Sequence, residues 1–216
     1  RRQRQMCIRD RYMPVEEEDG YTFLYNSKDL CLLPVMGKVM ALGLSGLKIE
    51  GRNRTSLYIA TTVQTYRKAR DAYLKDPEGF FVRPEWMDEL GKVSNREYFT
   101  GFFLGSPDEQ GINYDFTGYV HTHHLAAKVL KTGEGKTVFE ALNPIIEGME
   151  AQWLASSWPV RDFVFHDMIV EGSRKTRIRP NEVFEMKTGF VPLPGELIRK
   201  PLSEGDKVAV REACTS

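Results

Sequence analysis

The segment Leu47–Arg52 (LKIEGR) constrains the fold more than any other part of the chain. Leu47 and Ile49 alternate with two charged residues, so a strand here would have one apolar and one charged face. A helical pattern precedes the segment and another follows it, which is typical of βαβ units with a buried parallel sheet. Such folds build active sites at the carboxyl ends of their strands, where Lys48 and Glu50 would lie. An ordinary charged strand end is the alternative interpretation.

Two βα units are predicted in the first half of the chain. Strands are expected over Tyr21–Tyr25 and Gly46–Glu50. Thr55 or Ser56 is placed to cap a long helix, and a shorter helix is expected over Pro84–Leu90. The expected apolar face of the long helix consists of Ile59, Val63, Tyr66 and Tyr73.

Two βα units are too few to form a stable sheet by themselves. Both strand edges would stay unpaired, and the apolar helix surfaces would stay uncovered. The expected fold class is therefore α/β plus β, with the last units of a TIM-like (β/α) barrel followed by a β domain. The rest of the barrel is expected to precede Tyr12 in a longer parent, and the fragment alone is expected to be inactive.

After Ile112 the sequence changes to short runs rich in β-branched and aromatic residues, separated by turn residues. This spacing predicts a small antiparallel barrel or sandwich. The polar stretch 106–113 suggests the boundary, so residues 12–112 are assigned to the barrel part and 113–216 to the β domain. The expected strands are Phe116–Val120, Ala126–Leu130, Thr137–Ala141, Glu150–Leu154, Phe163–His166, Val183–Met186 and Lys207–Val210.

Residues 1–10 are expected not to be native. They back-translate to a transposase adapter used in preparing sequencing libraries, which would also set Arg11 and make Cys7 foreign. Removing their four Arg and one Asp from the 30 basic and 30 acidic residues leaves 26 and 29, a net charge of −3. That charge does not indicate a nucleic-acid-binding protein by itself. A basic nucleic-acid-binding arm is the alternative interpretation of residues 1–10.

The remaining composition excludes two classes of protein. No run of about 18 apolar residues is present, so no membrane span is predicted. Cys31 and Cys214 are far apart and outside any CxxC pattern, so a disulfide framework is not predicted. A cytoplasmic protein fits this composition.

Four ordered motifs resemble the collagenase-like peptidase family U32, peptidases of unknown catalytic type, over roughly residues 12–105. These motifs are Asn26–Leu30, Leu47–Arg52, Tyr58 with Thr65–Lys68, and Asn95–Phe102. The segment Pro194–Lys200 resembles the carboxy-terminal β-barrel domain of the family more loosely. The resemblance implies a TIM-like barrel followed by a small β-barrel, with the amino-terminal part of the barrel missing.

The resemblance also implies a choice of functions. The family is named for collagen degradation, but members also act in hydroxylation of tRNA wobble uridine with prephenate, of ribosomal RNA, or of ubiquinone precursors. A member with this carboxy-terminal domain is most similar to the tRNA-hydroxylation branch. We therefore expect a tRNA wobble-uridine hydroxylation factor that uses a small, prephenate-like carboxylate, with tRNA as partner. A collagenase-like peptidase and a non-catalytic RNA- or protein-binding β module are the alternatives.

Charged residues around the two predicted strand ends are the candidate site. Catalytic roles are assigned to Lys48, Glu50 and Arg52, because buried charges must pair and Arg offers a fork that matches a carboxylate. Substrate contacts are assigned to Asn26, Ser27, Lys28, Asp29, Arg96 and Tyr98. A peptidase would instead need a nucleophile with its base, and neither a Ser/His/Asp or Cys/His arrangement nor an HExxH motif is evident.

Two weaker sites complete the predictions. In the resemblance, Cys31 corresponds to a cysteine that ligates an iron–sulfur cluster in some relatives, and a [4Fe-4S] cluster is expected at most in the parent protein. The alternative is a small buried apolar residue. A basic run in the β domain could contact a tRNA backbone or be an ordinary solvated strand; it consists of Arg174, Lys175, Arg177 and Arg179.

Overall fold

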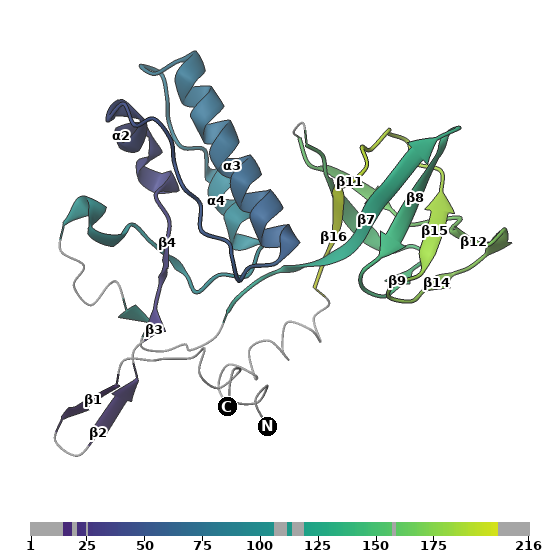
Figure 1. Cartoon of the computed structure of the whole chain (residues 1–216), viewed down its shortest axis with the longest axis horizontal. Helices are drawn as coiled ribbons and strands as arrows, with labels where there is room; N and C mark the ends of the chain where they lie inside the picture. The colour runs from purple at the N-terminus through teal and green to yellow at the C-terminus, as the bar shows by residue number, and fades with distance from the viewer. Residues whose placement is uncertain are drawn as a thin grey trace.

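A computed structural model describes residues 15–18, 21–24, 26–105, 112–113, 119–156 and 159–202 of the chain. Figure 1 shows a lobe with helices and, beside it, a lobe formed by an antiparallel sheet. The predictions for residues 1–11 and for the strand Lys207–Val210 lie outside the described residues, as does most of Phe116–Val120.

Helices form much of the first lobe. Its described helices are η1 (Leu33–Val35), α2 (Met36–Ala41), α3 (Ser56–Lys75), α4 (Pro84–Gly91) and η2 (Gly101–Leu104). The predicted start of the long helix is confirmed, because the Thr55 hydroxyl accepts a hydrogen bond from the Tyr58 N–H at 3.2 Å. The shorter predicted helix is confirmed as α4, which begins at Pro84.

The described strands of the first lobe are short and form three separate pairs. They are β1 (Val15–Glu18) with β2 (Tyr21–Leu24), β3 (Asn26–Ser27) with β6 (Ile112–Asn113), and β4 (Asp29–Leu30) with β5 (Tyr98–Phe99). The first two pairs are antiparallel and the third is parallel. Within the described residues this lobe therefore contains one short parallel pair, and a TIM-like barrel is not seen.

Two predicted strands are corrected by the structure. Tyr21–Tyr25 was expected in a parallel sheet, but Tyr21–Leu24 is the second strand of a hairpin, because it pairs with the segment directly before it. Gly46–Glu50 forms no strand. It pairs with no described strand, and a single extended segment gains no ladder hydrogen bonds.

The predicted apolar face of α3 is confirmed in part, since Tyr66 packs against a buried cluster and the Tyr73 ring contacts that of Phe80. Ile59 and Val63 are 42% and 44% exposed. The residues that are buried instead are Leu57, Thr61, Thr62, Thr65 and Ala69. Four of these five are small or Thr, and Ala69 shares a cluster with Trp86 and Leu90 of α4. Close packing of the helices, rather than side-chain hydrophobicity, thus selects the buried face.

The described part of the second lobe consists mainly of an antiparallel sheet of eight strands in the order β11-β10-β16-β7-β8-β15-β12-β13. Their bounds are β7 (His123–Gly133), β8 (Lys136–Ala141), β10 (Glu150–Leu154), β11 (Arg161–Val164), β12 (Ile169–Val170), β13 (Ser173–Arg174), β15 (Val183–Met186) and β16 (Leu197–Pro201). The predictions of strands at 126–130, 137–141, 150–154 and 183–186 are confirmed, and the one at 163–166 overlaps β11.

A further pair, β9 (Ile145–Ile146) with β14 (Arg177–Ile178), links the two ends of this sheet. Next to it the Glu147 N–H donates to the Thr176 carbonyl at 2.8 Å, and the Gly148 N–H donates to the Phe165 carbonyl at 2.8 Å. The sheet therefore wraps around a single core.

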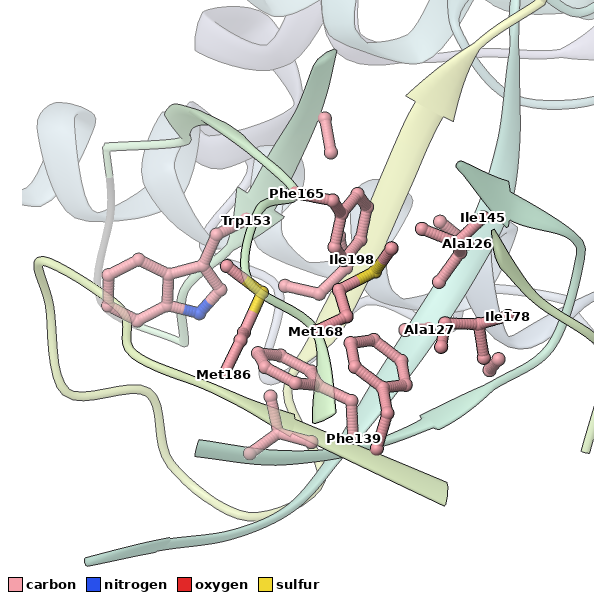
Figure 2. Close-up of a cluster of buried hydrophobic side chains, with 14 of the residues drawn as sticks. Ala126, Ala127, Phe139, Ile145, Trp153, Phe165, Met168, Ile178, Met186 and Ile198 are labelled. Carbon is pink, nitrogen blue, oxygen red and sulfur yellow. The ribbon is translucent and has the colours of Figure 1, made fainter. Parts of the chain in front are cut away.

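Apolar side chains from most strands fill that core (Figure 2). The Phe139 and Phe184 rings stack with centroids 5.2 Å apart, and both residues are almost fully buried. Trp153 stacks on Phe190 at 4.2 Å and donates its indole N–H to Glu196 at 2.7 Å. Trp153 is thus a residue of the core, with its polar indole N–H paired.

A buried ion pair joins the two lobes. Arg199 of β16 is fully buried, and its Nη2 donates to both carboxylate oxygens of Glu89 on α4, at 3.0 and 2.7 Å. Its Nε donates to Gln152 at 2.9 Å, and Lys92 lies 2.5 Å from Glu89. An apolar cluster formed by Leu57, Val93, Leu154 and Leu197 lies in the same contact.

The position of His123, at the start of β7, predicts a pH-dependent stability. Burial, together with the positive charges of Arg199 and Lys92, lowers the pKa of His123 from 6.5 to about 4. Between these two values the unfolded chain binds a proton that the folded chain does not, so the free energy of unfolding should fall as the pH falls through this window. Above pH 6.5 His123 is neutral in both the folded and the unfolded chain, so none of this stability is lost there.

Urea denaturation from about pH 7.5 to about pH 4 measures this effect. The variant His123→Gln should show a smaller loss of stability across the same range. An equally steep loss in that variant would assign the effect to another group.

Candidate functional site

A pocket of about 690 Å³ lies in the first lobe, beside β4 and the start of α3. Its charged lining residues are Asp29, Lys48, Glu50, Arg52, Arg54 and Arg96. Four cations and two anions give this lining a net charge of +2. Its apolar lining includes Cys31, Met36, Val39, Leu47 and Leu90. A pocket of this size and charge suits a small anionic ligand with an apolar part.

Asp29 is the buried centre of the charged part, with 7% exposure. It accepts hydrogen bonds from Arg54 Nη2 at 2.7 Å and from Arg96 Nε and Nη2 at 3.0 and 2.9 Å. The Arg96 backbone N–H adds a contact of 3.3 Å. The strand β4 fixes this position, because the Asp29 N–H donates to the Glu97 carbonyl at 2.8 Å. Two cations thus share one carboxylate.

The guanidinium of Arg54 is held on several sides. Its Nη1 donates to the Ser94 carbonyl at 3.3 Å. Its Cζ lies 4.8 Å from the ring centre of Tyr58 and 4.9 Å from that of Tyr119. Cation–π contacts with two rings, added to the Asp29 ion pair, fix the plane of this side chain.

A strained turn brings Arg96 to Asp29. Glu97 has a φ of 64°, a left-handed conformation that is uncommon outside glycine. The Asn95 side chain supports the turn by accepting the Glu97 N–H at 3.1 Å. Lys28 pairs with the Glu97 carboxylate at 3.0 Å, so Lys28 lies beside the turn rather than in the pocket lining. Conformational strain of this kind is often found at functional sites.

The predicted catalytic residues Lys48, Glu50 and Arg52 line the outer part of the pocket and are exposed. Glu50 accepts the backbone N–H of Arg52 at 2.9 Å. This hydrogen bond, with the nearby charge of Lys48, lowers the pKa of Glu50. Pairing was expected because these charges were predicted to be buried, but Lys48 and Glu50 are exposed and Lys48 forms no salt bridge with a described residue. Their catalytic roles stay a prediction.

The apolar wall contains Cys31 and two tyrosines. The Tyr66 hydroxyl accepts the N–H groups of Leu32 and Leu33 at 3.0 and 3.1 Å and lies 3.5 Å from Cys31 Sγ. Burial raises the pKa of the Cys31 thiol, which keeps it protonated near neutral pH. The Tyr98 hydroxyl donates to the Leu90 carbonyl at 2.9 Å, so Tyr98 contributes its ring to the pocket.

These residues do not fit a complete iron–sulfur site. Such a cluster needs about four thiolates. Among the residues that the structure describes, Cys31 is the one cysteine. Among the residues with described positions, no three His, Cys, Asp or Glu side chains are grouped as metal ligands. A cluster in the parent protein stays a prediction, with Cys31 as its one ligand from this chain.

The structure says less about two further sets of predicted site residues, namely Asn26 with Ser27 and the basic run of the β domain. Asn26 and Ser27 form β3, but their side chains lie outside the described residues. In the basic run, Arg174 pairs with Glu147 at 2.7 Å and Lys175 with Glu182 at 3.0 Å. The carboxylates neutralise half of the run. Arg177 and Arg179 are exposed and form no salt bridge within the described part of the chain.

The sequence interpretation missed Arg54 and Tyr119. Arg54 directly precedes Thr55, the cap of α3, and a cation at a helix start is unfavourable for the helix dipole. This unfavourable position of a cation at the start of a helix is the sequence feature that could have identified Arg54. Tyr119 lies in the second half of the sequence, and no pattern in the sequence relates it to Arg54.

No helix in the described ranges is long and apolar enough to cross a bilayer.

Proteins with similar sequences include tRNA hydroxylation proteins and proteins named Collagenase. The tRNA hydroxylation protein P1 of Bacillus subtilis is 43% identical over 113 residues, which cover 48% of this chain and 26% of that protein. A protein of Porphyromonas gingivalis named Collagenase is 29% identical over 98 residues, which cover 45% of this chain and 24% of that protein. The chain thus spans about a quarter of the length of these curated relatives.

A solved structure of the carboxy-terminal domain of a U32 peptidase from Geobacillus thermoleovorans superposes with a TM-score of 0.34 and 20% identity. The superposition covers 36% of this chain and 99% of that one. A TM-score of this size does not establish a common fold. The model of Peptidase family U32 matches residues 2–113 of the sequence. Since this match covers more than half of the chain, the protein belongs to Peptidase family U32.

Proposed function

We propose that this chain is part of a tRNA hydroxylation protein that acts on the wobble uridine. The observation that carries the proposal is the 43% identity to a tRNA hydroxylation protein over 113 residues. The match to the family model spans residues 2–113, which include the residues that line the pocket. tRNA is then the macromolecular substrate, and a cytoplasmic location follows from the location of tRNA.

The pocket is proposed to bind a small carboxylate co-substrate such as prephenate. The net charge of +2 on its lining supports this proposal, because a carboxylate would reduce the repulsion among four cations. Arg54 and Arg96 have the planar fork that pairs with carboxylates. The exposed Arg177 and Arg179 are proposed as backbone contacts for tRNA in the second lobe.

A collagenase-like peptidase is the alternative that one relative's name suggests. Cys31, the thiol of the described pocket, is a poor candidate for the nucleophile of such a peptidase, because burial raises its pKa. Its closest polar side-chain contact is the hydroxyl of Tyr66, which would not act as a base near neutral pH.

Deleting the gene that encodes this chain, followed by mass spectrometry of tRNA nucleosides, tests the proposal. We expect hydroxylated wobble uridine to be lost and to return when the gene is supplied on a plasmid. A host with a second hydroxylation pathway needs deletion of both genes before the comparison. Unchanged hydroxylation in such a strain, together with lost cleavage of a collagen peptide, would favour the peptidase.

A further inference from the structure

We infer that the second lobe, by docking on the first, stabilises the charged centre of the pocket through the segment that connects the two lobes. The charged centre consists of Asp29, Arg54 and Arg96, and the connecting segment consists of residues 119–122. The inference concerns how the pocket is held in its observed form. It therefore applies to any ligand and does not depend on the proposed function.

The connecting segment contacts the charged centre through Tyr119. The centre of its ring lies 4.9 Å from Cζ of Arg54 and 5.6 Å from Cζ of Arg96. Asp29 supplies one negative charge to these two guanidinium groups, so the three groups carry a net charge of +1 and the two cations repel each other. The face of an aromatic ring attracts cations. Tyr119 thus favours the arrangement in which both arginines stay on Asp29.

The segment is attached to the first lobe directly beside Arg96. Val120 and Asn95 exchange two backbone hydrogen bonds of 2.9 and 2.8 Å. The buried Asn95 side chain also accepts the Glu97 N–H at 3.1 Å, in the turn that carries Arg96. A shift of the segment would therefore move the turn that places Arg96 at the charged centre.

The other end of the segment is held by the contact between the lobes. The Thr122 carbonyl accepts the N–H of Leu202, directly after β16, at 2.8 Å. The Thr122 N–H donates to the Lys92 carbonyl at 3.3 Å. The Lys92 ammonium pairs with Glu89, which also binds Arg199 of β16. One end of the segment thus follows the position of the second lobe, while the other end contacts the charged centre.

The contact between the lobes has a defect that favours its separation. Nη1 of the fully buried Arg199 has no hydrogen-bond partner among the described residues. A buried cationic donor without an acceptor is unfavourable, so this contact is weaker than one with every donor paired. Polar contacts between two parts of a chain commonly allow relative motion. The docked and separated lobes are therefore the two states that the charged centre senses.

The rate at which iodoacetamide labels the Cys31 thiol tests this inference. Cys31 is 2% exposed and its N–H donates to the Phe99 carbonyl at 2.8 Å, so it becomes accessible when the β4–β5 pair opens. Asp29 lies in the same pair, so this opening also breaks the charged centre. The measurement uses a chain with Cys7→Ser and Cys214→Ser, in which Cys31 is the one thiol. Iodoacetamide is uncharged, so the charge of the pocket does not alter its approach.

Loosening the contact between the lobes should accelerate labelling. Arg199→Met removes the buried ion pair and should raise the rate about tenfold. Leu197→Ala removes apolar surface from the same contact and should act in the same direction. Tyr119→Leu removes the ring from the charged centre and should also raise the rate about tenfold.

The double variant Arg199→Met with Tyr119→Leu distinguishes coupling from two separate effects. We expect labelling about tenfold faster than in the starting chain, because the ring has already left the charged centre when the lobes separate. Two independent effects would multiply to about a hundredfold. A rise of that size would overturn the inference, as would an unchanged rate in Tyr119→Leu.

Two control variants should label as slowly as the starting chain. Tyr119→Phe keeps the aromatic face. Phe139→Leu weakens the core of the second lobe away from the contact, which separates opening of the β4–β5 pair from unfolding of the whole chain. If Arg199→Met labels no faster than Phe139→Leu, the second lobe does not support the charged centre. Near-ultraviolet circular dichroism of each variant confirms that it is folded.

Discussion

Replacing Arg199 with Ala is expected to lower the free energy of unfolding by about 3–5 kcal/mol. Arg199 is fully buried and donates to both oxygens of Glu89, which is itself 6% exposed. Removing the guanidinium leaves a buried carboxylate with Lys92 as its remaining ion-pair partner. Urea denaturation at neutral pH, followed by circular dichroism, measures the loss.

Two variants serve as controls for this prediction. Lys136→Ala removes a cation from an ion pair with Glu185 whose side chains are 41% and 33% exposed, and should cost less than about 1 kcal/mol. The double variant Arg199→Met with Glu89→Leu replaces both buried charges by apolar groups and should recover much of the lost stability. If Arg199→Ala costs no more than Lys136→Ala, the buried pair does not stabilise the contact between the lobes.

Replacing Phe139 with Ala is expected to cost about 3–5 kcal/mol. Phe139 is fully buried on β8 and stacks on Phe184 at 5.2 Å in the core of the second lobe. Phe139 lies among the buried side chains of this core (Figure 2), so removing its ring would leave a cavity. The same denaturation experiment measures this change.

Phe102→Ala is the matched control, because Phe102 is 79% exposed in η2. Removing its ring creates no cavity and should change the free energy of unfolding by about 0.5 kcal/mol or less. Equal losses in the two variants would mean that Phe139 is not packed in the core.

Sequence patterns within a few neighbouring residues correctly predicted helices and strands whose formation depends mainly on those neighbours. The capping hydroxyl of Thr55 and the apolar periodicity after it predicted α3 at its observed start. Short runs rich in β-branched and aromatic residues, bounded by turn residues, predicted β15 and β10 with their observed bounds. In each case the prediction used only residues that lie a few positions apart in the sequence.

Elements that depend on distant partners could not be predicted in this way. Gly46–Glu50 has the alternation of a strand, but strand formation also needs a neighbour at hydrogen-bonding distance. The charged centre of the site likewise depends on contacts across the sequence. Asp29 was predicted as a site residue, whereas its partner Arg54 was overlooked because no periodic pattern connects the two positions.

The pairing of β4 with β5 has a consequence for the order of folding. Asp29 and Arg96 are separated by 67 residues in the sequence, so their contact closes a long loop. The helix α3 can begin to form from contacts between residues one turn apart. The cationic centre should therefore assemble late, after the helix that carries one of its walls, and a chain emerging from the ribosome would lack a binding site until residue 96 has left the exit tunnel.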